Sequence, residues 1–373
     1  FLVTNALTLR QQLGKAFDEV QRRAGSAAVA AVNAGTISDD TRVYQATFSA
    51  ADWSGNLYAR RINANGTFGA QDWDAATRLP SHTARKIATV NSNGTAVPFR
   101  WTDLDSTRQG QIRGPDSVTV GQQRLNYLRG DRSLELRNGG YFRNRNPISP
   151  LGDMINSAPV FVAKPAFRYP DNLESVAYSS FRDANANRAA MIYIGGNDGM
   201  LHAFDAVTGE EKWAFIPGQA FNNLRLLSEP TYTHKYFVDG SPTMADAFWM
   251  GQWRTVLVTG LGQGGQGVFT LDITNPNAAT EASVASKYMW SFTDANDSDM
   301  GFALSRPSVV RAANGDWVAI FGNGYNNTAP DGNVSSTGNA VLYIVRLRDG
   351  QLLRKIDTEV GYADDPTGQA RPN

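Results

Sequence analysis

The sequence predicts a mainly β protein, a modified β-propeller of four-stranded blades with a helical and mixed N-terminal section. Three segments open with a similar serine and proline pattern, which ends at Pro159, Pro242 and Pro307. Each opening is followed by an apolar strand that ends in glycine and then by a second apolar strand. A further strand completes each unit. Four short strands per repeat are typical of a propeller blade.

The three predicted blades occupy about 151–217, 237–292 and 303–358 of the segment 151–373. The spacing between their prolines exceeds the roughly 40–50 residues of compact blades, so we expect loop insertions. A closed ring usually needs about four to eight blades. We therefore expect the chain to be truncated, with the closing strands beyond Asn373.

The N-terminal section, residues 1–150, mixes helix and strand. A helix over 8–24 is predicted by a capping box that starts at Thr8 and by apolar residues at helical spacing. A second short helix is expected over Gly121–Leu128. The strands within Tyr44–Ile62 match the blade pattern loosely and predict a further blade.

The composition excludes several classes of function. The 35 Lys and Arg residues balance the 35 Asp and Glu residues, whereas a nucleic-acid-binding protein needs a surplus of positive charge. The absence of Cys excludes disulfides, zinc–thiolate sites, iron–sulfur clusters and cysteine nucleophiles. No apolar run reaches the roughly 18 residues of a membrane-spanning helix, so no transmembrane segment is predicted.

The motifs argue against an enzyme. Gly260–Gly265 has the spacing of a dinucleotide-binding loop and follows an apolar strand. Such a site requires a helix next, whereas Gly267–Asp272 alternates like a strand, so we interpret the glycines as a hairpin. His82, His202 and His234 form no zinc-binding motif, and no Ser lies in a nucleophile elbow.

One segment resembles a repeat of the pyrroloquinoline-quinone dehydrogenases, which are propeller enzymes. Ala203–Trp213 matches their pattern A-x-D-x-x-T-G-x-x-x-W. The resemblance implies an architectural role, in which Asp205 and Thr208 close a turn and Trp213 packs between neighbouring blades. A quinone-dependent dehydrogenase is therefore an alternative, although no cluster of catalytic carboxylates stands out.

Two polar loops place oxygen-bearing side chains at alternating positions, as calcium loops do. These candidate metal ligands are Asp183, Asn185 and Asn187 in the first loop, and Asp294, Asn296 and Asp299 in the second. Both loops lack some ligands and the glycine of a complete calcium loop. Solvated turns are the alternative for both.

Arg129, Gly130 and Asp131 form the tripeptide that integrins recognise through its paired charges. A match of three residues arises easily by chance. The alternative is local: Gly130 ends the second helix and Asp131 caps the next turn.

Several blocks resemble signature blocks of the PilY/PilC family of type IV pilus biogenesis and tip adhesin proteins. They follow the family's order across about Leu125–Gly361, and Val43–Leu79 resembles the family more loosely. The blocks are Leu151–Val160, Tyr193–Asp205, Phe237–Pro242, Gly260–Gly265, Ser305–Ser308 and Phe321–Tyr325. Collinear blocks are far more specific than any single motif above.

The resemblance implies a propeller in a secreted bacterial protein that reaches the outer surface and the pilus tip. Such proteins promote pilus assembly, oppose retraction and contribute to host-cell adhesion and twitching. We therefore expect an exported, non-enzymatic interaction module without an organic cofactor. Minor pilins and host-cell receptors are the expected partners. A periplasmic propeller scaffold is a further alternative.

The resemblance also implies Ca²⁺, bound by a loop of the type D-x-D-x-[DN]-G. That loop follows the point where this sequence ends, so its ligands correspond to no residue here. The Asp183–Asn187 loop has a comparable place before a blade strand, which suggests a degenerate copy.

Two inserts, 163–190 and 217–236, are longer than strand connection requires and are predicted to contact partners. Deleting Phe221–Leu227 is expected to weaken binding to pilus components without unfolding the protein.

Overall fold

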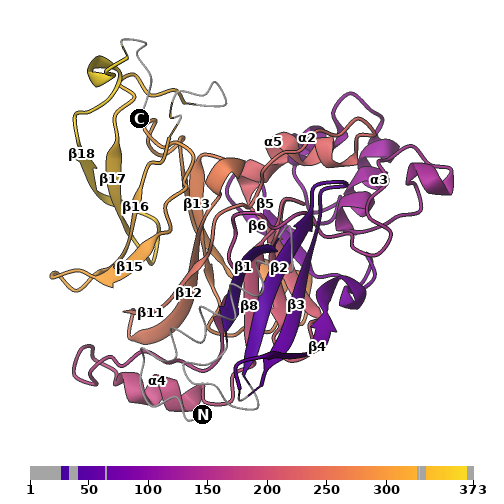
Figure 1. Ribbon diagram of the computed structural model, residues 1–373. Helices are drawn as coiled ribbons and strands as arrows, with labels where there is room; N and C mark the ends of the chain where they lie inside the picture. The colour runs from indigo at the N-terminus through magenta and orange to yellow at the C-terminus, as the bar shows by residue number, and fades with distance from the viewer. Residues whose placement is uncertain (1–26, 33–40, 64, 326, 328–332, 368–373) are drawn as a thin grey trace.

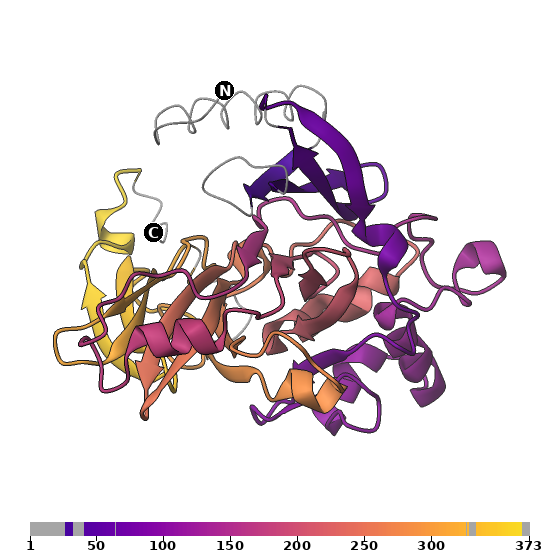
Figure 2. The same ribbon diagram turned by 90° about the horizontal axis from the view of Figure 1, so that it is seen from below.

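The structure is a computed structural model that describes residues 27–32, 41–63, 65–325, 327 and 333–367. Four sheets lie side by side in an arc, with short helices at both ends of the strands (Figures 1 and 2). The predicted mainly β, propeller-like fold is confirmed, and within the described residues the arc does not close into a ring. The predicted helix 8–24 lies outside the described residues.

Each sheet contains four consecutive strands in an antiparallel meander, and we number these blades 1 to 4 in sequence order. Blade 1 has β1 (Ala27–Val32), β2 (Arg42–Ser49), β3 (Ser54–Ile62) and β4 (Phe68–Asp74). Blade 2 has β7 (Val160–Val162), β8 (Met191–Gly195), β9 (Leu201–Asp205) and β10 (Glu211–Ile216). Blade 3 has β11 (Thr243–Trp249), β12 (Gln252–Gly260), β13 (Gly267–Asp272) and β14 (Tyr288–Thr293). Blade 4 has β15 (Ser308–Arg311), β16 (Trp317–Gly322), β17 (Val341–Arg346) and β18 (Leu352–Asp357).

The burial of the strands follows their place in the arc. All five residues of β8 are buried because blade 2 is covered on both faces by its neighbours. In β17, Val341, Tyr343 and Val345 are buried while Leu342 is exposed, which is the period-2 alternation of a sheet covered on one side.

Blade 2 is widened by two strands from the N-terminal section. β5 (Ile87–Val90) pairs with β10 in parallel, and β6 (Ala96–Pro98) pairs with β5. Residues 85–145 are therefore built onto blade 2, and their side chains share one buried cluster with those of 200–237.

The helices are short and lie at the ends of the blades. They are α2 (Ser106–Arg113), α3 (Val118–Arg129), α4 (Tyr178–Ala184), α5 (Phe221–Leu224) and α6 (Glu281–Ala285). Single 3₁₀ turns occur at Ala75–Arg78, Leu136–Asn138, Gly218–Ala220, Arg225–Ser228, Gly262–Gly264 and Tyr362–Asp364. The predicted helix at Gly121–Leu128 is confirmed as the middle of α3. No helix in the described part of the protein is long and apolar enough to span a membrane.

The predicted turn motif of blade 2 is confirmed. The Asp205 carboxylate accepts hydrogen bonds from the backbone N–H groups of Val207 and Thr208. Trp213 is fully buried and belongs to the same core cluster as Phe269 of blade 3. The motif is therefore architectural in this protein.

The insert 163–190 folds back onto blades 3 and 4, and its helix α4 lies at the end of the blades opposite α2 and α5 (Figure 1). Tyr169 stacks on Trp253 with ring centroids 5.5 Å apart, and Tyr178 donates a hydrogen bond to the buried Asp246. This anchoring makes part of the insert core rather than free surface.

The insert 217–236 is anchored in the same way. Phe221, Leu224 and Leu227 are at most 5% exposed and pack in the cluster that joins α2, α3 and blade 2. The expectation that Phe221–Leu227 is dispensable for folding is therefore wrong, because its deletion would remove three core side chains.

Candidate functional site

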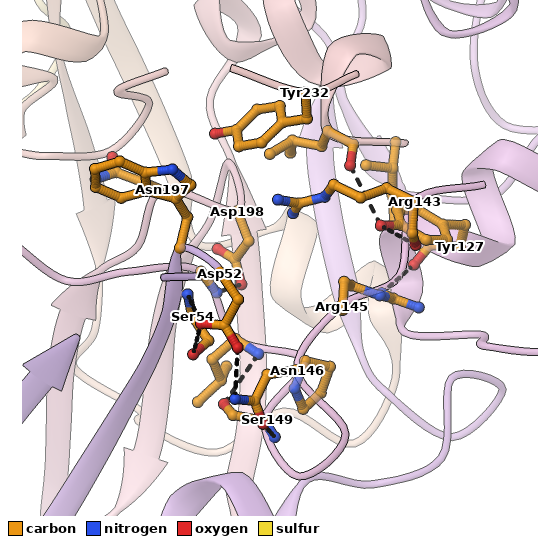
Figure 3. A pocket seen from close by; sticks show the side chains of 16 residues that line it. Asp52, Ser54, Tyr127, Arg143, Arg145, Asn146, Ser149, Asn197, Asp198 and Tyr232 are labelled. Carbon is orange, nitrogen blue, oxygen red and sulfur yellow. Dashed lines mark hydrogen bonds between the residues drawn. The ribbon is translucent and has the colours of Figure 1, made fainter. Parts of the chain in front are cut away.

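A pocket forms where five separate segments meet at one end of blades 1 and 2 (Figure 3). The segments are the β2–β3 turn, the end of α3, residues 143–152, the β8–β9 turn and residues 227–232. We call it the Arg143 pocket. The lining residues are Asp52, Trp53, Ser54, Tyr127, Leu128, Arg143, Arg145, Asn146, Ser149, Pro150, Leu151, Gly152, Asn197, Asp198, Leu227 and Tyr232.

The floor of the pocket comes from two signature blocks. Asn197 donates a side-chain hydrogen bond to the Asp153 carboxylate over 2.7 Å, and the Gly152 N–H donates to Asp198 over 3.2 Å. His234 lies 2.9 Å from the same Asp153 carboxylate. Burial raises the pKa of Asp153, and its hydrogen bonds to Asn197 and His234 oppose that rise. These hydrogen bonds connect the loop at residues 152–153 to the β8–β9 turn and give the pocket a rigid base.

Below the floor, four charged groups form a buried series. Asp198 lies 3.0 Å from His202 Nε2, Glu211 lies 2.7 Å from His202 Nδ1, and Arg85 bonds Glu211 over 2.6 Å. Burial alone would lower the pKa of His202, but the two carboxylates raise it to about 9. Burial likewise opposes ionisation of Glu211, yet Arg85 and His202 lower its pKa to about 2. Each of these buried charges lies next to an opposite charge, and this pairing offsets the free-energy cost of removing the charges from water.

The wall from blade 1 is the β2–β3 turn. Trp53 has a φ of 55°, which is uncommon outside glycine, and its ring packs against His234, tilted by 33° with centroids 4.0 Å apart. The Asp52 carboxylate accepts hydrogen bonds from Ser54 and Asn146, each over 2.7 Å. The turn is therefore held from both sides with its indole facing the pocket.

The two arginines of the opposite wall differ. The Arg145 guanidinium donates hydrogen bonds to the buried Glu135 carboxylate over 2.9 Å and to the Tyr127 carbonyl over 2.7 Å. The Arg143 guanidinium stacks on the Tyr232 ring, with its central carbon 4.2 Å from the ring centroid. Within the described part of the protein that guanidinium has no hydrogen-bond acceptor or carboxylate partner, and its Nε is buried.

The tripeptide Arg129-Gly130-Asp131 has the local structural role that was the alternative to an adhesion motif. Gly130 ends α3 in the left-handed conformation, and Asp131 accepts a hydrogen bond from the Ser133 N–H. The Arg129 side chain is fully buried and bonds the carbonyl oxygens of Phe99 and Arg85. An integrin-like partner needs an exposed guanidinium, so this burial argues against the adhesive interpretation.

The first calcium candidate does not gather its ligands. Asp183 lies in the last turn of α4 and Asn185 just after it, where the Asn185 side chain donates to the Phe181 carbonyl. Asn187 lines an open cleft opposite Asn275, with no carboxylate among the cleft residues. The donor set of this loop does not fit Ca²⁺, which requires several converging oxygens.

The second candidate holds a cation from the protein itself. The Lys355 ammonium group lies 2.8 Å from Asp297 and 2.5 Å from Asp299. The other predicted ligands turn elsewhere: Asn296 accepts from the Thr293 N–H and Asp294 from the Asn333 N–H. The described residues contain no group of three or more His, Cys, Asp or Glu side chains arranged for a metal ion. The calcium expectation stays a prediction.

The glycines of Gly260–Gly265 serve packing. A Cβ at position 264 would overlap the carbonyl oxygen of Phe237, and one at position 240 would overlap the carbonyl of Gly260. The segment joins β12 to β13, as the hairpin interpretation requires, and no helix follows it.

The Arg143 pocket was not predicted from sequence. Trp53, Arg143 and Tyr232 lie far apart in sequence and belong to no motif. Two signals were indirect: the blocks that contain Gly152 and Asn197 carry the family resemblance, and Tyr232 lies in the insert 217–236, which was predicted to contact partners.

Comparison with known proteins defines the family. The family model described as "PilY1 beta-propeller domain" matches residues 151–373. The chain belongs to the PilY1 β-propeller family. It is 39% identical over 417 aligned residues to a type IV pilus biogenesis factor PilY1 homolog of Xylella fastidiosa strain Temecula1, covering all of this chain and 27% of that protein.

Two further relatives come from Pseudomonas aeruginosa. Type IV pilus biogenesis factor PilY1 of strain PAK is 35% identical over 390 residues, which cover 97% of this chain and 32% of the relative. The crystal structure of the PilY1 C-terminal domain is 35% identical with a TM-score of 0.42, covering 53% of this chain and 36% of that chain. This PilY1-family chain thus spans about a third or less of the curated relatives named here.

Proposed function

We propose that this PilY1-family protein is an exported binding module that serves type IV pilus biogenesis at the cell surface. In this proposal it contacts minor pilins of the tip complex, supports assembly against retraction and contributes to attachment to surfaces or host cells. Its relatives are named type IV pilus biogenesis factors, which supports the pilus assignment.

The observation that carries the proposal is the residue set around the Arg143 pocket. Trp53, Tyr232 and Arg143 are of the three residue types most enriched at binding hot spots. They surround a rigid floor, and among the pocket's charged groups in the described structure only the Arg143 guanidinium makes no hydrogen bond. A propeller scaffold of this kind presents loops on a fixed frame, which suits binding.

The alternatives gain less support. The quinoprotein-like motif at Ala203–Trp213 is used for blade packing, and no observation in the described residues favours a quinone-dependent enzyme or a periplasmic scaffold. The binding module is therefore the one function that we propose.

The test is complementation in a type IV-piliated bacterium that lacks its own copy of the full-length protein. The variant Trp53→Ala with Arg143→Ala is compared with wild type for surface piliation, twitching and attachment. We expect all three to fall several-fold while export, followed by surface immunodetection, stays at the wild-type level.

The matched control is Trp249→Ala with Arg254→Ala, which likewise removes one indole and one guanidinium but on blade 3, where the Arg254 central carbon lies 5.2 Å from the Trp249 ring centroid. Both double variants must melt within a few degrees of wild type. Wild-type piliation, twitching and attachment in the Trp53 and Arg143 variant would overturn the proposal.

A further inference from the structure

The Arg143 guanidinium carries five N–H donors, and none of them has an acceptor in the described structure. Its Nε is buried, and an unmet buried donor on a charged group is costly. The two carboxylates that line the same pocket are already engaged. Asp52 accepts from Ser54 and Asn146, and Asp198 pairs with His202.

The surroundings hold this guanidinium in one orientation. The Arg143 N–H donates to the Ser228 carbonyl over 2.9 Å, and its own carbonyl accepts from the Tyr127 hydroxyl over 3.2 Å. The Tyr232 ring covers one face of the guanidinium plane. Figure 3 shows the head of Arg143 directed into the pocket between Tyr232 and Asp198. The two Nη groups, rather than the buried Nε, therefore face the space where a ligand would enter.

The size of the pocket restricts what enters. Its cavity volume is about 30 Å³, which leaves room for roughly two water molecules. A whole metabolite does not fit, whereas a small group at the tip of a larger partner does. A planar carboxylate matches the guanidinium fork through two parallel N–H···O bonds.

We propose that Arg143 binds a carboxylate presented by a partner protein, either on an Asp or Glu side chain or at the partner's C-terminus. This inference rests on the proposed function, because it names the chemistry that the binding module recognises. Trp53 and Tyr232 contact the residues that flank the carboxylate, while Asp52 disfavours a second negative charge beside it. A neutral carbonyl oxygen also accepts hydrogen bonds from a guanidinium, so the experiment compares a carboxylate with an amide of nearly the same shape.

The test observes the Arg143 Nε–Hε signal by NMR in the ¹⁵N-labelled 373-residue protein, identified by its absence in Arg143→Lys. The probes are sodium propionate and propionamide, which have nearly the same shape but differ in charge, with sodium chloride as the salt control. We expect a saturable shift with propionate in the millimolar range and none with propionamide or chloride. Equal shifts with all three, or no shift, would overturn the inference.

Three short peptides then distinguish the sources of the carboxylate. Ac-Ala-Glu-Ala-NH₂ has its only carboxylate on the glutamate, Ac-Ala-Ala-Ala-OH has its only carboxylate at the C-terminus, and Ac-Ala-Gln-Ala-NH₂ is the neutral control. The peptide with the correct source binds wild type, and Arg143→Lys weakens it about tenfold because the fork is lost while the charge is kept. Equal affinity for the Gln peptide, or for the Arg143→Lys variant, contradicts the proposed recognition.

The outcomes separate this inference from the proposed function. In one outcome, the Trp53→Ala, Arg143→Ala variant does not restore piliation, twitching and attachment, and propionate does not shift the Arg143 Nε–Hε signal. This outcome supports the proposed binding module and rejects carboxylate recognition by Arg143. If propionate binds but the variant supports normal piliation, twitching and attachment, the pocket binds carboxylates and the proposed function falls.

Discussion

The indole N–H of Trp213 donates a hydrogen bond to the backbone carbonyl of Pro276, 2.8 Å away in the next blade. The same relationship ties blade 1 to blade 2 through Trp73 and Ala206 over 3.2 Å. It ties blade 3 to blade 4 through Trp290 and Leu347 over 2.6 Å. One buried tryptophan from the last strand of each of blades 1, 2 and 3 therefore joins that blade to the next one, and the arc follows the order of the sequence.

Replacing Trp213 by Phe is expected to lower the free energy of unfolding by about 2–4 kcal/mol, because it removes core volume and leaves the Pro276 carbonyl unpaired. Urea unfolding followed by circular dichroism measures the change. Val207→Ala, at a 61% exposed position in the adjacent turn, is the control and should stay within about 0.5 kcal/mol of wild type. A Trp213→Phe variant as stable as its control would show that the indole does not join the blades.

Stability should fall as pH rises from about 6.5 to 9, because the pKa of His202 is raised to about 9 in the folded protein from an ordinary value of 6.5. A group whose pKa is raised on folding stabilises the folded protein fully at pH values below its unfolded-state pKa. This stabilisation is lost as the pH rises through its folded-state pKa. Glu211, with its pKa lowered to about 2 from 4.5, stabilises the fold above pH 4.5 and loses this effect as the pH falls. Melting temperatures across pH 4 to 10 should therefore peak near pH 4.5 to 6.5.

The variant that checks this assignment is His202→Gln, which should flatten the decline between pH 6.5 and 9 as well as lower the stability at pH 6. The surface substitution His82→Gln is the control. An unchanged decline in His202→Gln would assign the pH dependence to other groups.

Gly264→Ala should destabilise the protein by at least about 2 kcal/mol, because the new methyl group would overlap the Phe237 carbonyl. Gly110→Ala is its counterpart within α2, where an added Cβ meets nothing within 4 Å and helix propensity improves. Thermal melts of both variants test whether these glycines serve packing. Equal melting temperatures for the two would refute the packing role.

Lys355→Met should lower stability by about 1–2 kcal/mol, since it leaves the carboxylates of Asp297 and Asp299 facing each other at a partly exposed site. Calcium should restore part of the loss in this variant and leave the wild-type melting temperature unchanged, with EDTA as the reference condition. Calcium-dependent stabilisation of the wild type would instead support a metal site in this protein.

Much of the architecture was predictable because it depends on local patterns. The Ser-Pro openings recur before blades 2, 3 and 4, so these three blades could be predicted from the repeated opening and strand pattern, whereas the strands of Tyr44–Ile62 matched it only loosely. The surroundings of the candidate ligands could not. Nothing near Asp299 in sequence indicates Lys355, and nothing near Arg129 indicates that its guanidinium is buried beneath residues 82–99.

The sequence by itself determined the four-stranded blades and the hairpin at Gly260–Gly265, because strand periodicity and turn residues act over a few positions. The family was indicated separately, by the resemblance of collinear blocks such as Leu151–Val160 to the family's signature blocks. Only the tertiary structure decided which polar groups are satisfied. Long-range packing buries Arg129, neutralises Asp299 and leaves the Arg143 guanidinium without an acceptor in the described structure. The proposed binding depends on that last property, which arises only when Trp53, Arg143 and Tyr232, each about 90 residues from the next in sequence, come together.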